Sequence, residues 1–185
     1  SLAAEPVNVH FCKGIKGKVG LARANAFREG TADYVAFVDA DDEVVSGAFN
    51  AALEVLDSHP DIVATYCDVQ LINEPDGVGY FKAPWNPLAQ LFGPSEVHHL
   101  HVMRRSAVEP HLAELEQWDG YEEYALMGLI CQFGQQYHIP KAWYRFRQHN
   151  AYPRAGAIGG DQMRIAAGRR VLPILYPLIK AGVYQ

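Results

Sequence analysis

The sequence predicts an α/β fold, in which strands and helices alternate and the sheet contains parallel pairs. Residues 34–38 and 62–66 are short apolar runs of the kind found in buried strands. Between them, residues 48–56 place apolar side chains at helical spacing, and His59-Pro60 follows as a stop signal. A strand–helix–strand order of this kind is typical of a sheet covered by helices.

The other elements of the first half follow from local patterns. A weak alternation over residues 6–11 predicts a strand, and residues 21–28 predict a short helix closed by Gly30. Residues 73–95 are rich in proline and glycine and predict a long loop. Loops of that length in compact domains usually carry function or motion.

The second half is predicted to continue the same architecture. Residues 96–103 and 143–146 are expected to be strands, and residues 122–133 a helix capped by Gly134. Residues 162–179 form an amphipathic stretch, for which we expect core or dimer contact. Membrane-surface contact is the alternative, because basic side chains flank the apolar ones.

Length and composition indicate one globular domain. The 185 residues are 49% hydrophobic and 20% charged, which excludes wholesale disorder. We expect a single domain over residues 1–185, with a core at 7–150 and a helical extension at 151–185. The net charge is −5, from 16 basic and 21 acidic residues, so no nucleic-acid partner is expected.

The cysteines and the hydropathy pattern bear on location. Cys12, Cys67 and Cys131 are odd in number and widely spaced, so they predict buried reduced thiols and no disulfide framework. A reducing compartment fits, and we expect a cytoplasmic protein, with peripheral membrane contact as the variant. No apolar run approaches the ~18 residues of a membrane span.

A cluster of carboxylates follows the apolar run at 34–38. Asp39, Asp41 and Asp42 repel one another unless a cation neutralises them, and Mg²⁺ or Mn²⁺ prefers such oxygen ligands. The plainest alternative is a solvated turn that caps the next helix. Phosphoryl transfer, as in the haloacid dehalogenase-like phosphatases, is disfavoured because Glu43 stands where their pattern prefers Thr or Val.

Four motifs in order resemble the family 2 glycosyltransferases of GT-A fold, over roughly residues 8–150. That family reads Gly-x-x-x-Ala-Arg-Asn, then a strand running into Asp-x-Asp-Asp, then an acidic pair before a helix, then Tyr-x-x-Arg-x-His. The matching segments here are Gly20-Leu21-Ala22-Arg23-Ala24-Asn25, Tyr34-Val35-Ala36-Phe37-Val38-Asp39-Ala40-Asp41-Asp42, Tyr121-Glu122-Glu123-Tyr124 and Tyr144-Arg145-Phe146-Arg147-Gln148-His149.

The resemblance implies a fold and a donor site. The fold would be a GT-A-like three-layer sandwich with a mixed, mostly parallel sheet. Asp39 and Asp41 would face a nucleotide-diphosphate sugar, with Asp41 as the first metal ligand and Asp42 beside it. Mn²⁺ or Mg²⁺ would neutralise the leaving diphosphate. His149 would complete the metal shell, and Arg23 would lie against the donor.

The resemblance also implies an acceptor side. Glu123 would be the general base that deprotonates a glycan or other hydroxyl acceptor, with Glu122 as its stand-in, and the transfer would be inverting. The family normally has Asp at this position, and Glu is one methylene longer. Trp118 stands shortly before this acidic pair, so contact with the acceptor sugar and plain packing are both open for it. His99 and His101 would contact the acceptor. Metal binding by this histidine pair is the less favoured alternative.

One departure from the family pattern concerns its first strands, which carry Pro-x-Tyr-Asn and the residues that hold the base and ribose. Neither motif is found, so the fold is expected to be truncated on the N-terminal side. A truncated chain, a naturally short protein and a nucleotide-binding half from another chain are the open explanations. An exposed sheet edge would favour a homodimer. The alternative function is a non-catalytic or partner-dependent binding module.

Overall fold

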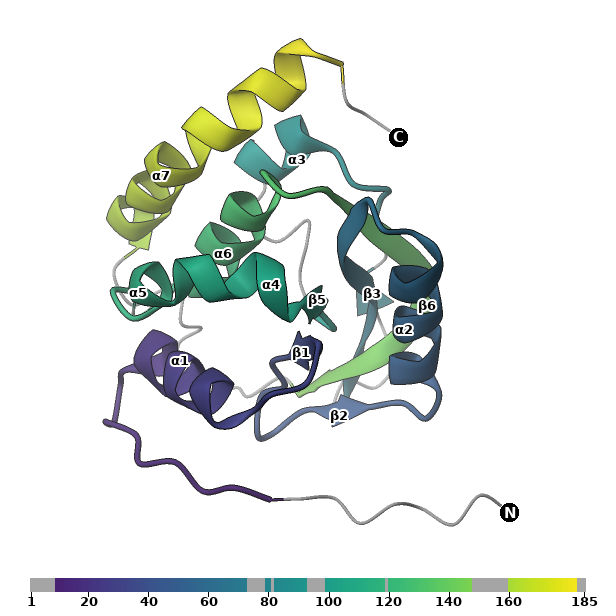
Figure 1. The fold of residues 1–185 in the computed structure, drawn as a ribbon, viewed down its shortest axis with the longest axis vertical. Helices are drawn as coiled ribbons and strands as arrows, with labels where there is room; N and C mark the ends of the chain where they lie inside the picture. Colours follow the sequence, from purple (N-terminus) through teal and green to yellow (C-terminus); the bar gives the residue numbers. More distant parts are fainter. Residues whose placement is uncertain are drawn as a thin grey trace.

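A computed structural model describes the fold (Figure 1). The described residues are 9–72, 79–80, 82–92, 99–118, 120–147 and 160–182. The strands are β1 (Tyr34–Ala36), β2 (Glu43–Val44), β3 (Ile62–Ile72), β4 (Gly79–Tyr80), β5 (Val102–Arg104) and β6 (Gln135–Arg147). The helices are α1 (Val19–Glu29), α2 (Ala48–Ser58), α3 (Pro87–Phe92), α4 (Arg105–Val108), α5 (Leu112–Leu115), α6 (Glu122–Ile130) and α7 (Gly160–Lys180), with a short 3₁₀ turn at Glu109–His111.

The strands form one mixed sheet in the order β1-β5-β3-β6-β2, and β4 pairs with β3. The expected α/β class and mixed sheet are confirmed, but the sheet is not mostly parallel. β3 and β6 run parallel from Ile62 opposite Gln135 to Ile72 opposite Arg147. The other described pairings are antiparallel. The reason is the strand order: α2 leads from β2 to β3, but β6 lies between these two strands, so the crossover does not create a parallel neighbour pair.

Strand β1 is less buried than its apolar sequence predicts. It covers three residues, all half-buried, and lies at the edge of the sheet. Among the described residues it pairs with β5 alone. The prediction of a strand at 34–38 is therefore right in place, but the expectation that this strand is buried is wrong.

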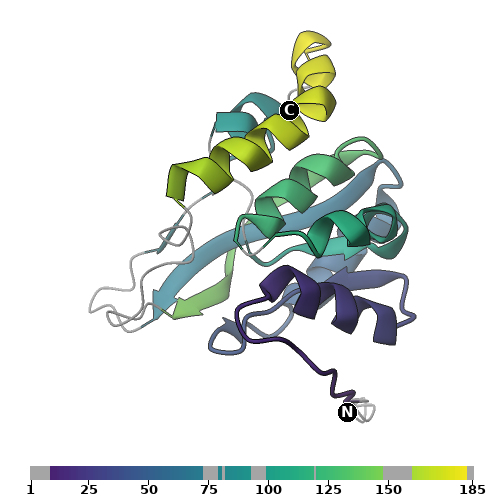
Figure 2. The same cartoon turned by 90° about the vertical axis from the view of Figure 1, so that its left-hand side faces the viewer.

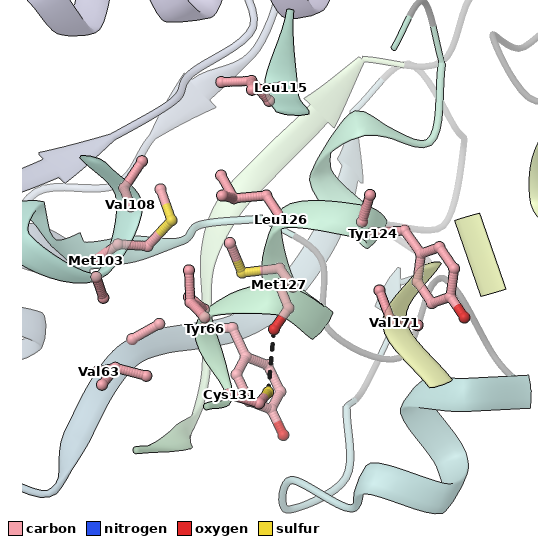
Figure 3. Packing of buried hydrophobic residues seen from close by; sticks show 14 of the residues in the cluster. Val63, Tyr66, Met103, Val108, Leu115, Tyr124, Leu126, Met127, Cys131 and Val171 are labelled. Atoms are coloured by element: carbon pink, nitrogen blue, oxygen red, sulfur yellow. Dashed lines mark hydrogen bonds between the residues drawn. The ribbon is translucent and has the colours of Figure 1, made fainter. Parts of the chain in front are cut away.

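Two apolar clusters lie against the sheet. One joins α2 to β3 and β6 through residues such as Ala52, Leu56 and Tyr144. The other, seen in Figure 3, packs α1, α4 and α6 on the sheet through residues that include Val63, Met103 and Met127. In Figure 1, α2 lies apart from these other helices, over β3 and β6, so the sheet is covered on two sides.

Helix α7 forms as the amphipathic stretch at 162–179 predicts. Ala167, Val171 and Leu175 are fully buried, and the helix packs along α3 and α6 (Figure 2). Gly128 of α6 allows this approach, because a Cβ there would lie 2.4 Å from the Val171 side chain. The expected core contact is thus observed. No helix among the described residues is both long and apolar enough to cross a membrane.

Several predicted boundaries shift. Residues 9–11 form no strand, and the rest of the predicted strand lies outside the described residues. α6 ends at Ile130, before the predicted cap at Gly134. Gly134 serves a different purpose: a Cβ there would lie 2.3 Å from the Asp61 carbonyl, where β6 begins beside β3. Cys12 is exposed, so the expectation of buried thiols is wrong for this residue and right for Cys67 and Cys131.

Candidate functional site

The carboxylate loop lies between β1 and β2, and the end of β6 holds it in place. The Tyr144 hydroxyl donates to Asp42 Oδ2 at 2.6 Å and accepts the Asp39 backbone N–H at 3.4 Å. The Arg147 backbone N–H donates to Asp42 Oδ1 at 2.8 Å, and its Nε donates to the Asp41 carbonyl at 2.8 Å. The loop conformation therefore depends on a strand about a hundred residues further along the chain.

Burial sets the protonation behaviour of this loop. Desolvation raises the pKa of Asp42, and the hydrogen bonds from Arg147 and Tyr144 partly offset it. Desolvation, followed by the bond to Asp42, raises the pKa of Tyr144 as well. Tyr144 therefore stays protonated and continues to donate to the carboxylate.

Arg23 connects the carboxylate loop to the acidic pair on α6. Its Nη2 lies 2.9 Å from Asp39 Oδ1, and its Nη1 lies 2.7 Å from Glu122 Oε1 and 2.9 Å from Glu123 Oε1. Burial lowers the pKa of Arg23, but the three carboxylates outweigh this and raise it overall. Arg23 is thus a fixed cation at the centre of the site.

Gly20 lies in the first turn of α1, three residues before Arg23. A Cβ on Gly20 would lie 2.0 Å from the Leu115 carbonyl and 2.5 Å from that of Trp118. A glycine therefore lets α1 approach this backbone closely, which brings Arg23 to the acidic groups.

Glu122 and Glu123 reach the site because a tight turn precedes α6. Tyr121 has φ 59° and ψ 14°, a left-handed conformation that is uncommon outside glycine. Both glutamates then fall in the first helical turn, where the helix dipole favours negative charge. Desolvation raises the pKa of Glu122, and the nearby Arg23 opposes the rise.

His99 stands between the two acidic groups. Its Nε2 lies 3.7 Å from Asp39 Oδ2 and 3.6 Å from Glu123 Oε2. Its ring stacks on Tyr144 at 4.6 Å between centroids. The backbone is held by Cys67, whose Sγ accepts the Leu100 N–H at 3.3 Å. Burial lowers the pKa of His99 to about 4, so the imidazole is neutral near pH 7.

Among the described residues, two groups of side chains have converging metal-ligand atoms. One group is Asp39, Asp42 and His99, and the other is His99, His101 and Glu123. Within each group the ligand atoms lie within 4.8 Å of one another. His99 belongs to both, so the two positions are neighbours. Carboxylates with one imidazole suit a hard divalent cation, which fits the predicted Mn²⁺ or Mg²⁺ in donor chemistry.

Most of the predicted site residues meet here. The structure brings together Arg23, Asp39, Asp42, His99, His101, Glu122 and Glu123. His99 and His101 are not on a strand, contrary to the expectation for residues 96–103, yet both are buried and their ring centroids lie 6.0 Å apart.

The structure does not bring the other three predicted residues into this cluster. Asp41, the residue expected to be the first metal ligand, is exposed and belongs to neither group of converging ligand atoms. Trp118 is half-buried and packs against the apolar cluster that contains α1. His149 lies outside the described residues. The roles expected of all three stay predictions.

Sequence reasoning missed Tyr144 and Arg147 as the residues that fix the carboxylate loop. The signal was present, since both belong to the Tyr-x-x-Arg-x-His segment. That segment indicates the family resemblance, but it does not reveal that its tyrosine binds Asp42.

Comparison with known proteins gives two findings. A family model described as glycosyl transferase family 2 matches residues 1–110. A curated protein of Sinorhizobium fredii (strain NBRC 101917 / NGR234), described as uncharacterized protein y4gI, is 30% identical over 164 residues. That alignment covers 84% of this chain but only 18% of the relative, so the chain spans about a fifth of the relative's length.

Proposed function

Because the chain belongs to glycosyl transferase family 2, we propose that it transfers a sugar from a nucleotide-diphosphate sugar to an acceptor hydroxyl. The GT-A fold expected from the sequence goes with this family, and family membership supports glycosyltransferase activity in general. The metal, the stereochemistry and the residue roles below are parts of the proposal.

The observation that carries the proposal is the three-way contact of Arg23. It holds Asp39 of the carboxylate loop and both glutamates of α6 within 2.9 Å of one guanidinium. A donor-side group and an acceptor-side pair are thereby fixed next to each other. Transfer requires such proximity, because the acceptor hydroxyl must meet the sugar carbon in a defined orientation.

The donor side is assigned to the carboxylate loop. Asp39, Asp41 and Asp42 are proposed to face the donor and hold Mn²⁺ or Mg²⁺, with His149 completing the shell. Such a cation, when bound, neutralises the charge of the departing diphosphate. Tyr144 and Arg147 position Asp42 and the backbone of Asp41 for this task.

The acceptor side is assigned to α6. Glu123 is proposed to remove the proton of the acceptor hydroxyl while the sugar is transferred with inversion. Its Oε2 faces His99 and its Oε1 contacts Arg23, so its orientation is fixed. Glu122 is the stand-in, and its raised pKa also suits a general base. Contacts of Trp118, His99 and His101 with the acceptor remain part of the proposal.

The test of the donor site is thermal stability with Mn²⁺ and a panel of nucleotide diphosphates. One nucleotide is expected to raise the unfolding midpoint only when Mn²⁺ is present. At about 100 times the dissociation constant the gain corresponds to about 2.7 kcal/mol. Asp41→Ala is expected to abolish the rise, whereas Glu54→Ala, at an exposed carboxylate on α2, keeps it.

A second arm tests the base. With a nucleotide-diphosphate sugar and an acceptor panel, Glu123→Gln is expected to keep donor binding and lose transfer, and Glu122→Gln to lose less. If no nucleotide raises the midpoint of the wild type, the proposal fails. The alternative function, a partner-dependent binding module, then becomes the favoured one. The edge strand β1 supports this alternative, because among the described residues it pairs with β5 alone.

A further inference from the structure

His99, His101 and Glu123 form a group whose chemistry differs from that of the carboxylate loop. Their ligand atoms all lie within 4.8 Å of one another. Both histidines are almost fully buried, with 2% and 1% of their surface exposed, and the Glu123 side chain is 12% exposed. Two imidazoles and one carboxylate therefore converge on one small volume at the inner end of the site.

This donor set favours a borderline transition metal. Imidazole nitrogen suits Zn²⁺ and its neighbours, whereas Mg²⁺ prefers oxygen ligands alone. Two histidines and a glutamate leave a fourth position open, which is the ligand count of an open zinc site.

The spacing is close to what such a site requires. Bonds of 2.0–2.1 Å put the ligand atoms of a tetrahedral zinc site about 3.3 Å apart. His99 Nε2 and Glu123 Oε2 already lie 3.6 Å apart. The upper limit of 4.8 Å for the group means that the ligand atoms need to close by at most about 1.5 Å, within reach of side-chain rotation.

The surroundings keep two of the ligands in position. Stacking on Tyr144 at 4.6 Å restrains the His99 ring. The contact between Glu123 Oε1 and Arg23 at 2.9 Å leaves Oε2 as the oxygen turned toward His99. Such outer contacts orient metal ligands and raise affinity.

We propose that His99, His101 and Glu123 bind Zn²⁺ or a similar transition metal, at a position separate from the oxygen-rich Asp39, Asp41 and Asp42 loop. One consequence rests on the proposed function: a metal here occupies the carboxylate assigned as the base. Zn²⁺ would then inhibit sugar transfer in the presence of Mn²⁺. The binding itself does not depend on that function.

The experiment titrates metal-free protein with Co²⁺ and Zn²⁺ in the absence of nucleotide. Co²⁺ bound by imidazoles is expected to give a visible absorption band that Zn²⁺ displaces at one equivalent per chain. His101→Gln and Glu123→Gln are expected to weaken Zn²⁺ binding at least about 100-fold. Removing a residue that only supports a metal ligand typically costs about 100-fold at most, so a direct ligand should cost at least this much.

Two controls locate the site. His111→Gln changes a histidine whose ring contacts Gln132 outside the group, and it is expected to leave affinity unchanged. Asp42→Asn is also expected to leave Zn²⁺ affinity within about two-fold, because Asp42 belongs to the other group. A loss in Asp42→Asn with no loss in His101→Gln would assign the metal to Asp39, Asp42 and His99 and overturn the proposal.

A measurement on the wild-type protein does not depend on whether the variants fold. X-ray absorption of the zinc-loaded protein is expected to show two imidazole ligands and an oxygen ligand. A shell of oxygen alone, or no zinc bound at micromolar concentration, would overturn the proposal. Neither result would bear on Mn²⁺-dependent nucleotide binding, so the failure of one proposal stays distinguishable from that of the other.

Discussion

His138 and His99 are both largely buried beside carboxylates, and their geometries differ. His138 Nε2 lies 2.8 Å from Asp68 Oδ1, which also accepts the Lys82 backbone N–H at 2.7 Å. His99 Nε2 lies 3.6 Å and 3.7 Å from its two carboxylates. The first spacing is a direct hydrogen bond and the second is too long for one.

The difference separates a structural pair from a site. The Asp68–His138 pair joins neighbouring strands β3 and β6, and its ring stacks on Tyr66 at 5.2 Å. Around His99, three elements bring charged side chains together, and Arg23 balances the carboxylates. A buried polar pair at hydrogen-bond distance stabilises a fold, whereas ligand atoms about 3.6 Å apart have a spacing close to that of groups that share one bound cation.

The largest effect is expected from Arg23→Met, which removes the cation that balances Asp39, Glu122 and Glu123. The variant leaves three carboxylates close together, and loss of one partner of a buried ion pair costs about 3 kcal/mol or more. The free energy of unfolding, measured with denaturant, is expected to fall by that amount. Arg28→Met, on the same helix and 46% exposed, is the control and is expected to lose about 1 kcal/mol at most.

The Arg23→Met defect also has a pH dependence. Burial already raises the pKa of Glu122, and removing Arg23 takes away the charge that opposes the rise. A pKa raised in the folded state means that the folded protein holds more protons, so stability declines as pH rises. The loss should therefore be greater near pH 8 than near pH 5. Equal losses at both values would contradict the charge-balancing role.

The sequence predicts the parts of the site that are local. The carboxylates Asp39 and Asp42 follow an apolar strand, and Glu122 and Glu123 open a helix, so each motif reveals its own element. Their grouping at one place follows only from the resemblance. The helices α2 and α7 were predictable for the same local reason, because their apolar periodicity lies within one segment. The end of α1 was predictable from Gly30.

The sequence does not predict what depends on distant pairing. His99 meets Glu123 because Cys67 on β3 holds the backbone after it, and no local pattern reveals this. Tyr144 reaches Asp42 because Val44 of β2 pairs opposite it. Only residues 143–146 of the long strand β6 were expected, since its mixture of polar and apolar residues before Trp143 gives no clear alternation.

A smaller effect is expected from His138→Leu, which breaks the Asp68–His138 hydrogen bond. Asp68 keeps its bond from Lys82 but loses the imidazole, and a buried carboxylate with one partner fewer costs about 1 to 3 kcal/mol. Zn²⁺ affinity should not change, because His138 belongs to neither group of converging ligands. Denaturant unfolding and metal titration of the same variant check both statements. A loss of Zn²⁺ affinity without unfolding would contradict the distinction between the two histidines.

The smallest change in stability is expected from Tyr144→Phe, at the residue that contacts both His99 and Asp42. The variant keeps the ring that stacks on His99 but removes the hydroxyl bound to Asp42 and Asp39. Asp42 is half-buried and keeps the Arg147 N–H, and the Asp39 bond is long at 3.4 Å, so the loss of stability is expected to be about 1 kcal/mol. Tyr66→Phe is the matched control. The Tyr66 hydroxyl donates to the Ala83 carbonyl, and the Tyr66 ring stacks on His138. Loss of this hydroxyl should cost a similar amount of stability.

The two tyrosine variants should differ in ligand binding. Tyr144→Phe leaves the Asp42 side chain held, among the described residues, by the Arg147 N–H alone, so Mn²⁺-dependent nucleotide affinity is expected to fall about ten-fold, as for the loss of an outer-shell partner. Tyr66→Phe should leave that affinity unchanged. Calorimetric titration of both variants separates positioning from plain stability, because equal affinity in the two would mean that Tyr144 only stabilises the fold. An unchanged Zn²⁺ affinity in Tyr144→Phe is also expected, since the stacked ring that restrains His99 is still present.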